Sequence, residues 1–201
     1  AFRPRALFER YGIEVITTTE SPLDSLEHHQ TIRSENGKSG GWQGRVLTAY
    51  RPDPVVDPEY ADSNGGFRHN LTRFSELTGE DCLSWQGYLA AHHKRRAFFA
   101  GMGATSTDHG HPTAQTADLP LAEAEALFRK VSASSFTSAE ADLFRAQMLT
   151  EMAAMSVDDG MVMQLHPGSF RNHNAQLFAR LGRDKGADIP SPTEYVRNLK
   201  P

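Results

Sequence analysis

The sequence contains a single cysteine, Cys82, among its 201 residues. One cysteine excludes an intrachain disulfide, which favours a reducing, cytoplasmic location. The sequence also lacks any run of about 18 apolar residues, so we expect no membrane span and no membrane partner. Its first residues show neither the apolar core nor the cleavage pattern of a secretion signal, which again favours the cytoplasm.

An excess of positive charge is absent as well. The 21 Lys and Arg residues are outnumbered by 25 Asp and Glu residues, the net charge is −4, and the two signs are mixed along the chain. Because a protein that binds nucleic acid usually presents a basic face, we expect no nucleic-acid partner. A basic run at residues 92–96 is interpreted as the solvated face of a helix.

The sequence contains, instead, an alternation of strand and helix patterns. Short runs bounded by turn residues predict strands at residues 13–18, 46–50, 104–107 and 161–165. Helical patterns lie between and after them, at residues 21–33, 67–77, 84–99, 119–131, 138–155, 175–181 and 193–199. This order predicts parallel strands joined by right-handed helical crossovers, an α/β fold in a single domain over residues 1–201.

Two local signals support the helix predictions. Ser21 as N-cap and Pro22 at the first helical position predict where the helix at residues 21–33 begins. In the helix at residues 138–155, Phe144, Met148 and Met152 recur at helical spacing, which predicts that they pack in the core.

Polar residues gather at the end of each predicted strand. In parallel α/β folds, ligands bind at the carboxyl ends of the strands, on the loops that lead into the helices. Four clusters in register with four strands therefore predict one shared polar site. The clusters lie at residues 17–22, 50–53, 107–111 and 164–174.

Arg51 follows the second predicted strand and offers a planar fork of donors that fits a carboxylate or a phosphate. The alternative is a structural salt bridge with Asp53 that closes the end of the sheet. Arg171 and Asn172 follow the fourth strand and suit a polyhydroxylated, anionic ligand, although they equally suit hydrogen bonding within a loop. Arg51, Arg171 and Asn172 are therefore the candidate substrate-binding residues.

Asp108 and His166 follow the third and fourth predicted strands and are the candidate catalytic residues. Both side chains can take part in acid–base chemistry, and Asp108 can also orient a neighbouring group. His109 and His111 form a His-x-His pattern that can present two imidazoles to one metal ion, but no further Cys or His lies at ligand spacing nearby. A simple turn at the end of the strand is the alternative for this run.

Together these segments resemble the uronate isomerase (glucuronate isomerase) family of the amidohydrolase superfamily. The resemblance runs through nearly the whole chain, and the combination is specific although no single segment is. It rests on Thr-Thr-Thr-Glu-Ser-Pro-Leu-Asp at residues 17–24 with His-His at 28–29, Tyr-Arg-Pro-Asp at 50–53, Thr-Asp-His-Gly at 107–110, and Met-Gln-Leu-His-Pro-Gly at 163–168 followed by Arg-Asn-His-Asn at 171–174.

The resemblance implies a fold, an activity and roles for three residues. The implied fold is a partial (β/α)8 barrel of the TIM type, with strands that resemble strands three to six of the family. The implied activity is aldose–ketose isomerisation of D-glucuronate to D-fructuronate and of D-galacturonate to D-tagaturonate, through an enediol, in sugar-acid catabolism. Arg51 matches the family's arginine at the substrate site, Asp108 an aspartate at the end of a middle strand, and His166 a histidine that contacts substrate.

The resemblance also implies that part of the family's site lies outside this sequence. The family binds a divalent metal, zinc, through a His-x-His motif after its first strand and an aspartate after its last, and His109 and His111 lie elsewhere in the strand order. A complete barrel takes about 250 residues and eight strands. We therefore expect a fragment with weak or absent isomerase activity of its own.

Such a fragment is expected to form a homo-oligomer or to associate with missing chain segments, because a partial barrel exposes sheet edges. Two other functions stay open from the sequence. One is a non-catalytic module for sugar-acid binding or oligomerisation, and the other is a metal-dependent hydrolase of the same superfamily.

Overall fold

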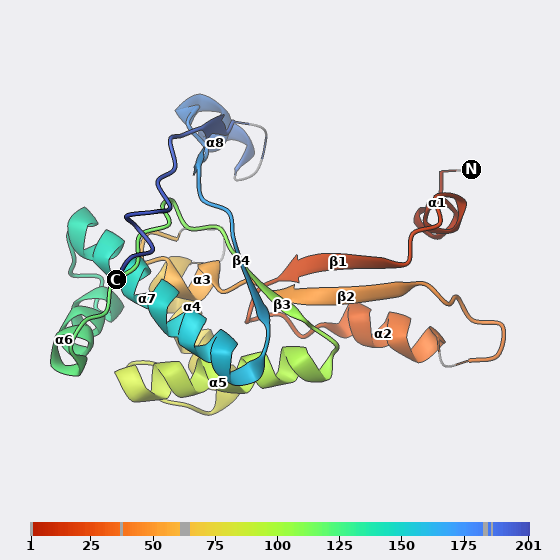
Figure 1. The fold of residues 1–201 in the computed structure, drawn as a ribbon, viewed down its shortest axis with the longest axis horizontal. Helices are drawn as coiled ribbons and strands as arrows, with labels where there is room; N and C mark the ends of the chain where they lie inside the picture. Colours follow the sequence, from red (N-terminus) through yellow and green to blue (C-terminus); the bar gives the residue numbers. More distant parts are fainter. Residues whose placement is uncertain (1, 37, 61–64, 183–184, 186) are drawn as a thin grey trace.

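The computed structural model describes residues 2–36, 38–60, 65–182, 185 and 187–201. Its centre is a four-stranded parallel sheet in the order β1-β2-β3-β4 (Figure 1). The strands are β1 (Val15–Glu20), β2 (Arg45–Tyr50), β3 (Ser106–His109) and β4 (Val162–Leu165). The prediction of parallel strands joined by helices is confirmed. Both β1 and β3 lie two residues further along the chain than predicted. As a result, Asp108 belongs to β3 itself rather than to the loop after it.

Helices occupy the connections between the strands and flank the sheet. Helices α4 to α7 gather on one side, α2 runs beneath β2, and α1 and α8 stand apart from this body (Figure 1). A short antiparallel pair, β5 (Ser169–Phe170) with β6 (Ile189–Pro190), brackets α8 in the sequence. The helices are α1 (Pro4–Arg10), α2 (Glu27–Asn36), α3 (Asp53–Val56), α4 (Gly66–Thr78), α5 (Trp85–Gly101), α6 (Leu121–Ser132), α7 (Ser138–Asp159) and α8 (Ala175–Leu181).

The ends of the two longest helices are fixed by local hydrogen bonds. The Ser84 hydroxyl caps α5 by accepting from the main-chain N–H of Gly87. Thr137 and Glu140 form a capping box at the start of α7. At its other end, α7 stops at Gly160. This residue adopts a left-handed φ of 74°, a conformation that glycine reaches at little steric cost. These signals are local, which is why the sequence predicted both helices.

The core lies between the helices and the sheet. Phe144, Met148 and Met152 of α7 are completely buried, which confirms their predicted place in the core. On the facing helices, the rings of Tyr88 and Phe128 stack with centroids 4.7 Å apart. Burial of such aromatic and thioether side chains is the main favourable contribution to folding.

The prediction that residues 92–96 form a solvated helix face is wrong, because three of these side chains are buried. His92 is completely buried and its Nδ1 hydrogen-bonds the hydroxyl of Tyr50 at 2.7 Å. Arg95 donates to the main-chain oxygens of Pro22 and Asp24 at 2.8 and 2.7 Å. Arg96 is 1% exposed and is paired with a carboxylate on α7. Each charge is buried because it has partners.

The helix predicted at residues 21–33 begins later, at Glu27. The Ser21 hydroxyl accepts from the N–H of Leu23, and the Asp24 carboxylate accepts from the N–H of Ser21. These side-chain bonds stabilise a turn, which competes with a helical start. Leu26 then adopts a φ of 57°, a conformation incompatible with a continuous helix.

The helix predicted at residues 193–199 is absent, and this segment forms a turn instead. The Glu194 carboxylate accepts from the main-chain N–H groups of Val196 and Arg197. The carbonyl of Asn198 accepts from both the N–H and the hydroxyl of Thr116. The segment keeps one main-chain bond of helical spacing, from the N–H of Leu199 to the carbonyl of Tyr195, and is otherwise held by docking onto a distant loop.

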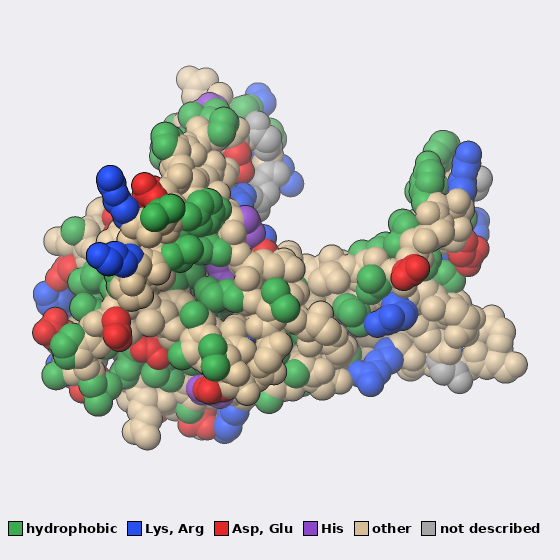
Figure 2. Space-filling view, in the orientation of Figure 1, with side chains coloured by type: hydrophobic (Ala, Val, Ile, Leu, Met, Phe, Trp, Pro, Cys, Tyr) green, Lys and Arg blue, Asp and Glu red, His purple; other side chains and the backbone are tan. Residues whose placement is uncertain are grey.

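Both edges of the sheet are uncovered in the part of the chain that the structure describes. There, β1 is hydrogen-bonded to β2 alone, and β4 to β3 alone. Val15, Ile16 and Val162 on these edge strands are 41%, 39% and 65% exposed. In Figure 2, the segments that carry α1 and α8 project from the body with an open gap between them. No described helix is both long and apolar enough to cross a bilayer.

Candidate functional site

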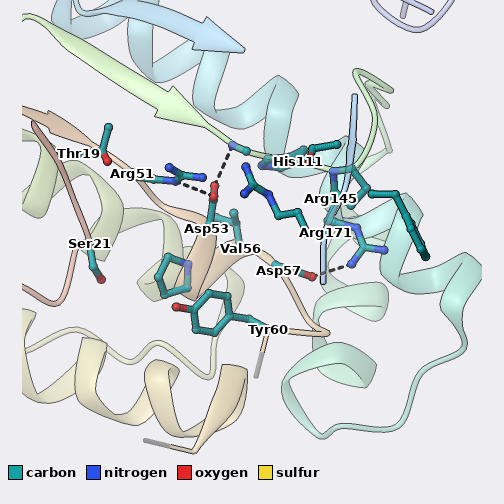
Figure 3. A pocket seen from close by; sticks show the side chains of 15 residues that line it. Thr19, Ser21, Arg51, Asp53, Val56, Asp57, Tyr60, His111, Arg145 and Arg171 are labelled. Carbon is teal, nitrogen blue, oxygen red and sulfur yellow. Dashed lines mark hydrogen bonds and ion pairs between the residues drawn. The ribbon is translucent and has the colours of Figure 1, made fainter. Parts of the chain in front are cut away.

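A cavity of about 550 Å³ lies at the carboxyl ends of the strands (Figure 3). Its lining mixes charged groups with small and apolar ones, drawn from segments far apart in the sequence. A site with convergent polar groups in a concave setting is the usual form of a small-molecule site. The lining residues are Thr19, Ser21, Arg51, Asp53, Pro54, Val56, Asp57, Tyr60, Gly110, His111, Pro112, Arg145, Ser169, Phe170 and Arg171.

Arg51 is held in this cavity by two carboxylates. The main-chain N–H of Arg51 donates to the main-chain carbonyl oxygen of Glu20 at 2.9 Å, which extends the pairing of β1 with β2 by one residue. Its Nε donates to Oδ2 of Asp53 at 2.9 Å, and its Nη1 lies 3.4 Å from Oδ2 of Asp108. The structural salt bridge with Asp53 is therefore present, and it leaves the guanidinium on the cavity wall.

Asp53 also ties two strand ends together. Its second oxygen, Oδ1, accepts from the main-chain N–H of Gly110 at 3.2 Å (Figure 3). A Cβ atom at position 110 would lie 2.5 Å from Nη2 of Arg51 and 2.7 Å from Oδ2 of Asp53. Glycine is thus required here for space, since any side chain would displace the Arg51–Asp53 pair.

Asp108 and His166 lie within ion-pairing distance of each other beside Arg51. Nε2 of His166 lies 3.0 Å from Oδ1 of Asp108, whose other oxygen faces Arg51. Asp108 is buried, whereas the His166 side chain is 43% exposed. The main-chain N–H of His166 donates to the carbonyl of His109, which fixes it at the end of β4. A carboxylate next to an imidazole is an arrangement suited to proton transfer, although its catalytic role here stays a prediction.

His109 and His111 do not act together on a metal in the described part of the chain. His109 is buried inside β3, and its Nε2 hydrogen-bonds the hydroxyl of Thr107 at 2.9 Å. His111 lines the cavity instead. Among the described residues, no three His, Cys, Asp or Glu side chains are grouped so that they would hold a metal ion. These residues therefore do not form a zinc site by themselves.

Arg171 reaches the same cavity from the segment after β5. Its Nη1 lies 3.2 Å from the Asp188 carboxylate, which comes from the segment before β6. Asn172 is outside the cavity lining, has a φ of 54°, and donates its main-chain N–H to Asp188 at 2.8 Å. The structure thus brings Arg171 together with Arg51, while substrate binding by Asn172 stays a prediction.

Arg145 was not predicted as a site residue; it lies within α7 and lines the cavity on the side away from Arg51 (Figure 3). Its guanidinium contacts Asp57 and Asp142 at 2.6 Å and Glu59 at 3.0 Å. Arg145 does not follow a predicted strand, and two of its three acidic partners lie more than 80 positions away, so strand-end patterns did not predict it. A cation surrounded by three carboxylates makes this wall rigid rather than strongly positive.

The parallel sheet with helical crossovers matches part of a (β/α)8 barrel of the TIM type, and its polar cavity lies at the strand ends, where such barrels bind their ligands. A sequence profile described as "Glucuronate isomerase" matches residues 1–200. The chain belongs to the glucuronate isomerase family.

Relatives and solved structures agree with this assignment. A uronate isomerase of Sphingopyxis alaskensis is 69% identical over 201 residues, which cover all of this chain and 42% of the relative. The crystal structure of glucuronate isomerase from Caulobacter crescentus has 58% identity and a TM-score of 0.90, and the match covers 100% of this chain and 40% of that one. A uronate isomerase structure from Thermotoga maritima has 26% identity and a TM-score of 0.87, and the match covers 98% and 42% of the two chains. The chain thus spans about two fifths of the length of these relatives.

Proposed function

We propose that this chain provides the substrate-facing part of a uronate isomerase. The reaction interconverts D-glucuronate with D-fructuronate, and D-galacturonate with D-tagaturonate. The observation that carries the proposal is the position of Arg51, held on the cavity wall by Asp53 and Asp108 next to the Asp108–His166 pair. This arrangement supports a carboxylate anchor at Arg51 next to a proton-transfer pair of Asp108 and His166.

In this proposal Arg51 binds the substrate carboxylate through its planar fork of N–H donors, and Arg171 adds positive charge on the same cavity. The reaction moves a proton between C2 and C1 of the open-chain sugar through an enediol. Asp108 and His166 are placed to relay protons or to stabilise charge that develops on the substrate oxygens. A divalent metal would polarise the carbonyl oxygen, but the described residues offer no ligand set for it, so we assign it no residues.

Binding of a uronate by the purified chain tests this proposal. We expect D-glucuronate and D-galacturonate to bind roughly tenfold or more tightly than D-glucose and D-galactose, because a charge-assisted hydrogen bond contributes about 1.5–3 kcal/mol. Isothermal titration calorimetry or ligand-observed NMR gives the four affinities. The neutral sugars are matched controls, since they differ from the acids at C6 alone. Equal affinity for acid and neutral sugar would show that the cavity has no carboxylate anchor.

We further propose that the chain associates with a copy of itself through its sheet edges. Unpaired N–H and C=O groups on an edge strand are a template for pairing with another strand. Burial of the exposed Ile16 and Val162 side chains in the interface would add hydrophobic stabilisation. Size-exclusion chromatography with light scattering should show dimers or larger species at micromolar concentration. Ile16→Lys and Val162→Lys should shift them towards monomer, whereas Val157→Lys, on the 85%-exposed position of α7, should not. A clean wild-type monomer would contradict this proposal.

A cytoplasmic location is also proposed. The single cysteine is buried and free, as expected for a protein of a reducing compartment, where disulfides are rare. Breakdown of sugar acids by a soluble enzyme fits the same compartment.

A further inference from the structure

His111 is a buried side chain with unused hydrogen-bonding capacity on the cavity wall. It is 5% exposed, it lines the cavity, and neither of its ring nitrogens has a hydrogen-bond partner among the described residues. Folded proteins leave few buried polar groups unpaired, because an unpaired group loses its contacts with water and gains nothing in exchange. The unpaired imidazole therefore calls for a partner that occupies the cavity.

Two other buried histidines show that His111 differs from a core histidine. His92 and His109 also have one unpaired nitrogen each. In both, however, the other nitrogen is bonded within the protein, to Tyr50 and to Thr107 respectively. Neither of them lines the cavity. His111 alone among these three has both nitrogens unpaired and faces the cavity.

Burial leaves the imidazole ring of His111 neutral near pH 7. Burial lowers the pKa of His111 to about 4, although the carboxylates of Asp53 and Asp57 act to raise it. Arg145 and His166 add to the lowering. A neutral imidazole has one N–H donor and one nitrogen acceptor. By contrast, an arginine on the same wall can only donate, and a carboxylate can only accept.

We propose that His111 is a specificity-determining residue that binds the hydroxyl groups of the sugar-acid chain, donating to one hydroxyl oxygen and accepting from the O–H of a second. This inference rests on the proposed function, in which Arg51 takes the carboxylate. Vicinal hydroxyls offer acceptors and donors on neighbouring atoms, and the neutral imidazole of His111 can pair with two of them through its two ring nitrogens. The combination of Arg51 and His111 then selects a ligand that is both anionic and hydroxylated.

Two variants of the full chain test the role of His111. His111→Phe keeps a planar ring but removes both nitrogens, so the affinity for D-glucuronate should fall roughly tenfold, as expected for two lost hydrogen bonds. His111→Gln keeps a donor and an acceptor and should bind within about threefold of wild type. The denaturation midpoint of His111→Phe should be equal or higher, since an unpaired polar group leaves the interior. A residue with a purely structural role would show the opposite: lower stability and unchanged affinity.

A wild-type measurement keeps the proposal testable if His111→Phe fails to fold. With ¹⁵N-labelled histidine, saturating D-glucuronate should shift the ring-nitrogen resonances of His111 and leave those of His92 in place. The proposal is overturned if Arg51→Met abolishes binding while His111→Phe binds like wild type, or if the His111 resonances do not move. If wild type binds uronates no better than D-glucose, both this inference and the proposed function are wrong.

Discussion

Replacing Arg51 with methionine is expected to weaken D-glucuronate binding roughly 10- to 150-fold, the equivalent of about 1.5–3 kcal/mol for a lost charge-assisted hydrogen bond. Methionine keeps the length of the side chain and removes the charge. The loss has a second source, because Asp53 and Asp108 would then face the cavity without their cation. An anionic ligand is repelled by such a site. Calorimetric titration of both proteins measures the effect.

Two further variants separate the anchor from general damage. Arg45→Met removes an exposed arginine at the opposite end of β2, and it should leave the affinity unchanged. Gly110→Ala retains the charge of Arg51 but places a methyl group 2.5 Å from its Nη2, so it should weaken binding in the same direction. If Arg51→Met binds D-glucuronate as tightly as wild type, the carboxylate anchor lies elsewhere.

Much of this site was predictable because it follows from strand order. Parallel strands bring their carboxyl ends to the same edge of the sheet, so residues after four separate strands must meet. Arg51, Asp108 and His166 do meet, through contacts of 3.4 and 3.0 Å. Arg171 also reaches the cavity that Arg51 lines. No knowledge of long-range packing was needed for these predictions.

The features that the sequence did not predict depend on long-range partners. Arg96 is paired with a carboxylate 63 positions away, and two of the three carboxylates that surround Arg145 lie more than 80 positions away, which no local pattern predicts. The same holds for the segment at residues 193–199, which docks onto Thr116. His111 was noticed as a metal candidate, but its unpaired nitrogens are visible only when the cavity is known. Helical periodicity and strand-end chemistry are local signals, whereas the burial of a charge is not.

Asp159→Ala is expected to lower the free energy of unfolding by about 3 kcal/mol, within the 3–5 kcal/mol that breaking a buried ion pair costs. Nε and Nη2 of Arg96 donate to the two carboxylate oxygens of Asp159 at 2.6 and 2.9 Å, and Arg96 is 1% exposed. Alanine would leave that guanidinium buried in contact with the Ser156 hydroxyl, the Met152 sulfur and the Tyr50 ring, none of which carries a negative charge. The effect is placed at the low end because the Asp159 side chain is 26% exposed and water can partly replace it.

A double-variant cycle distinguishes an unpaired charge from a simple loss of contacts. Arg96→Met removes the charge that Asp159→Ala leaves behind, so the double variant should be more stable than Asp159→Ala alone. Urea denaturation measures all three, and Asp158→Ala, at the neighbouring exposed position of α7, should change stability by no more than about 0.5 kcal/mol. Strictly additive losses would mean that the two side chains act independently.

The same pair predicts how stability responds to acid. Burial acts to raise the pKa of Asp159, but hydrogen bonds from Arg96 and from the main chain of Met161 outweigh it, so the pKa in the folded protein is lowered. The stabilisation is therefore complete above the carboxyl pKa of the unfolded chain and is lost as the pH falls through the folded-state value. Wild type should thus lose stability on acidification more steeply than Asp159→Ala. Parallel pH profiles for the two proteins would mean that the charge of Asp159 contributes nothing, and that Arg96 is held by packing and Ser156 alone.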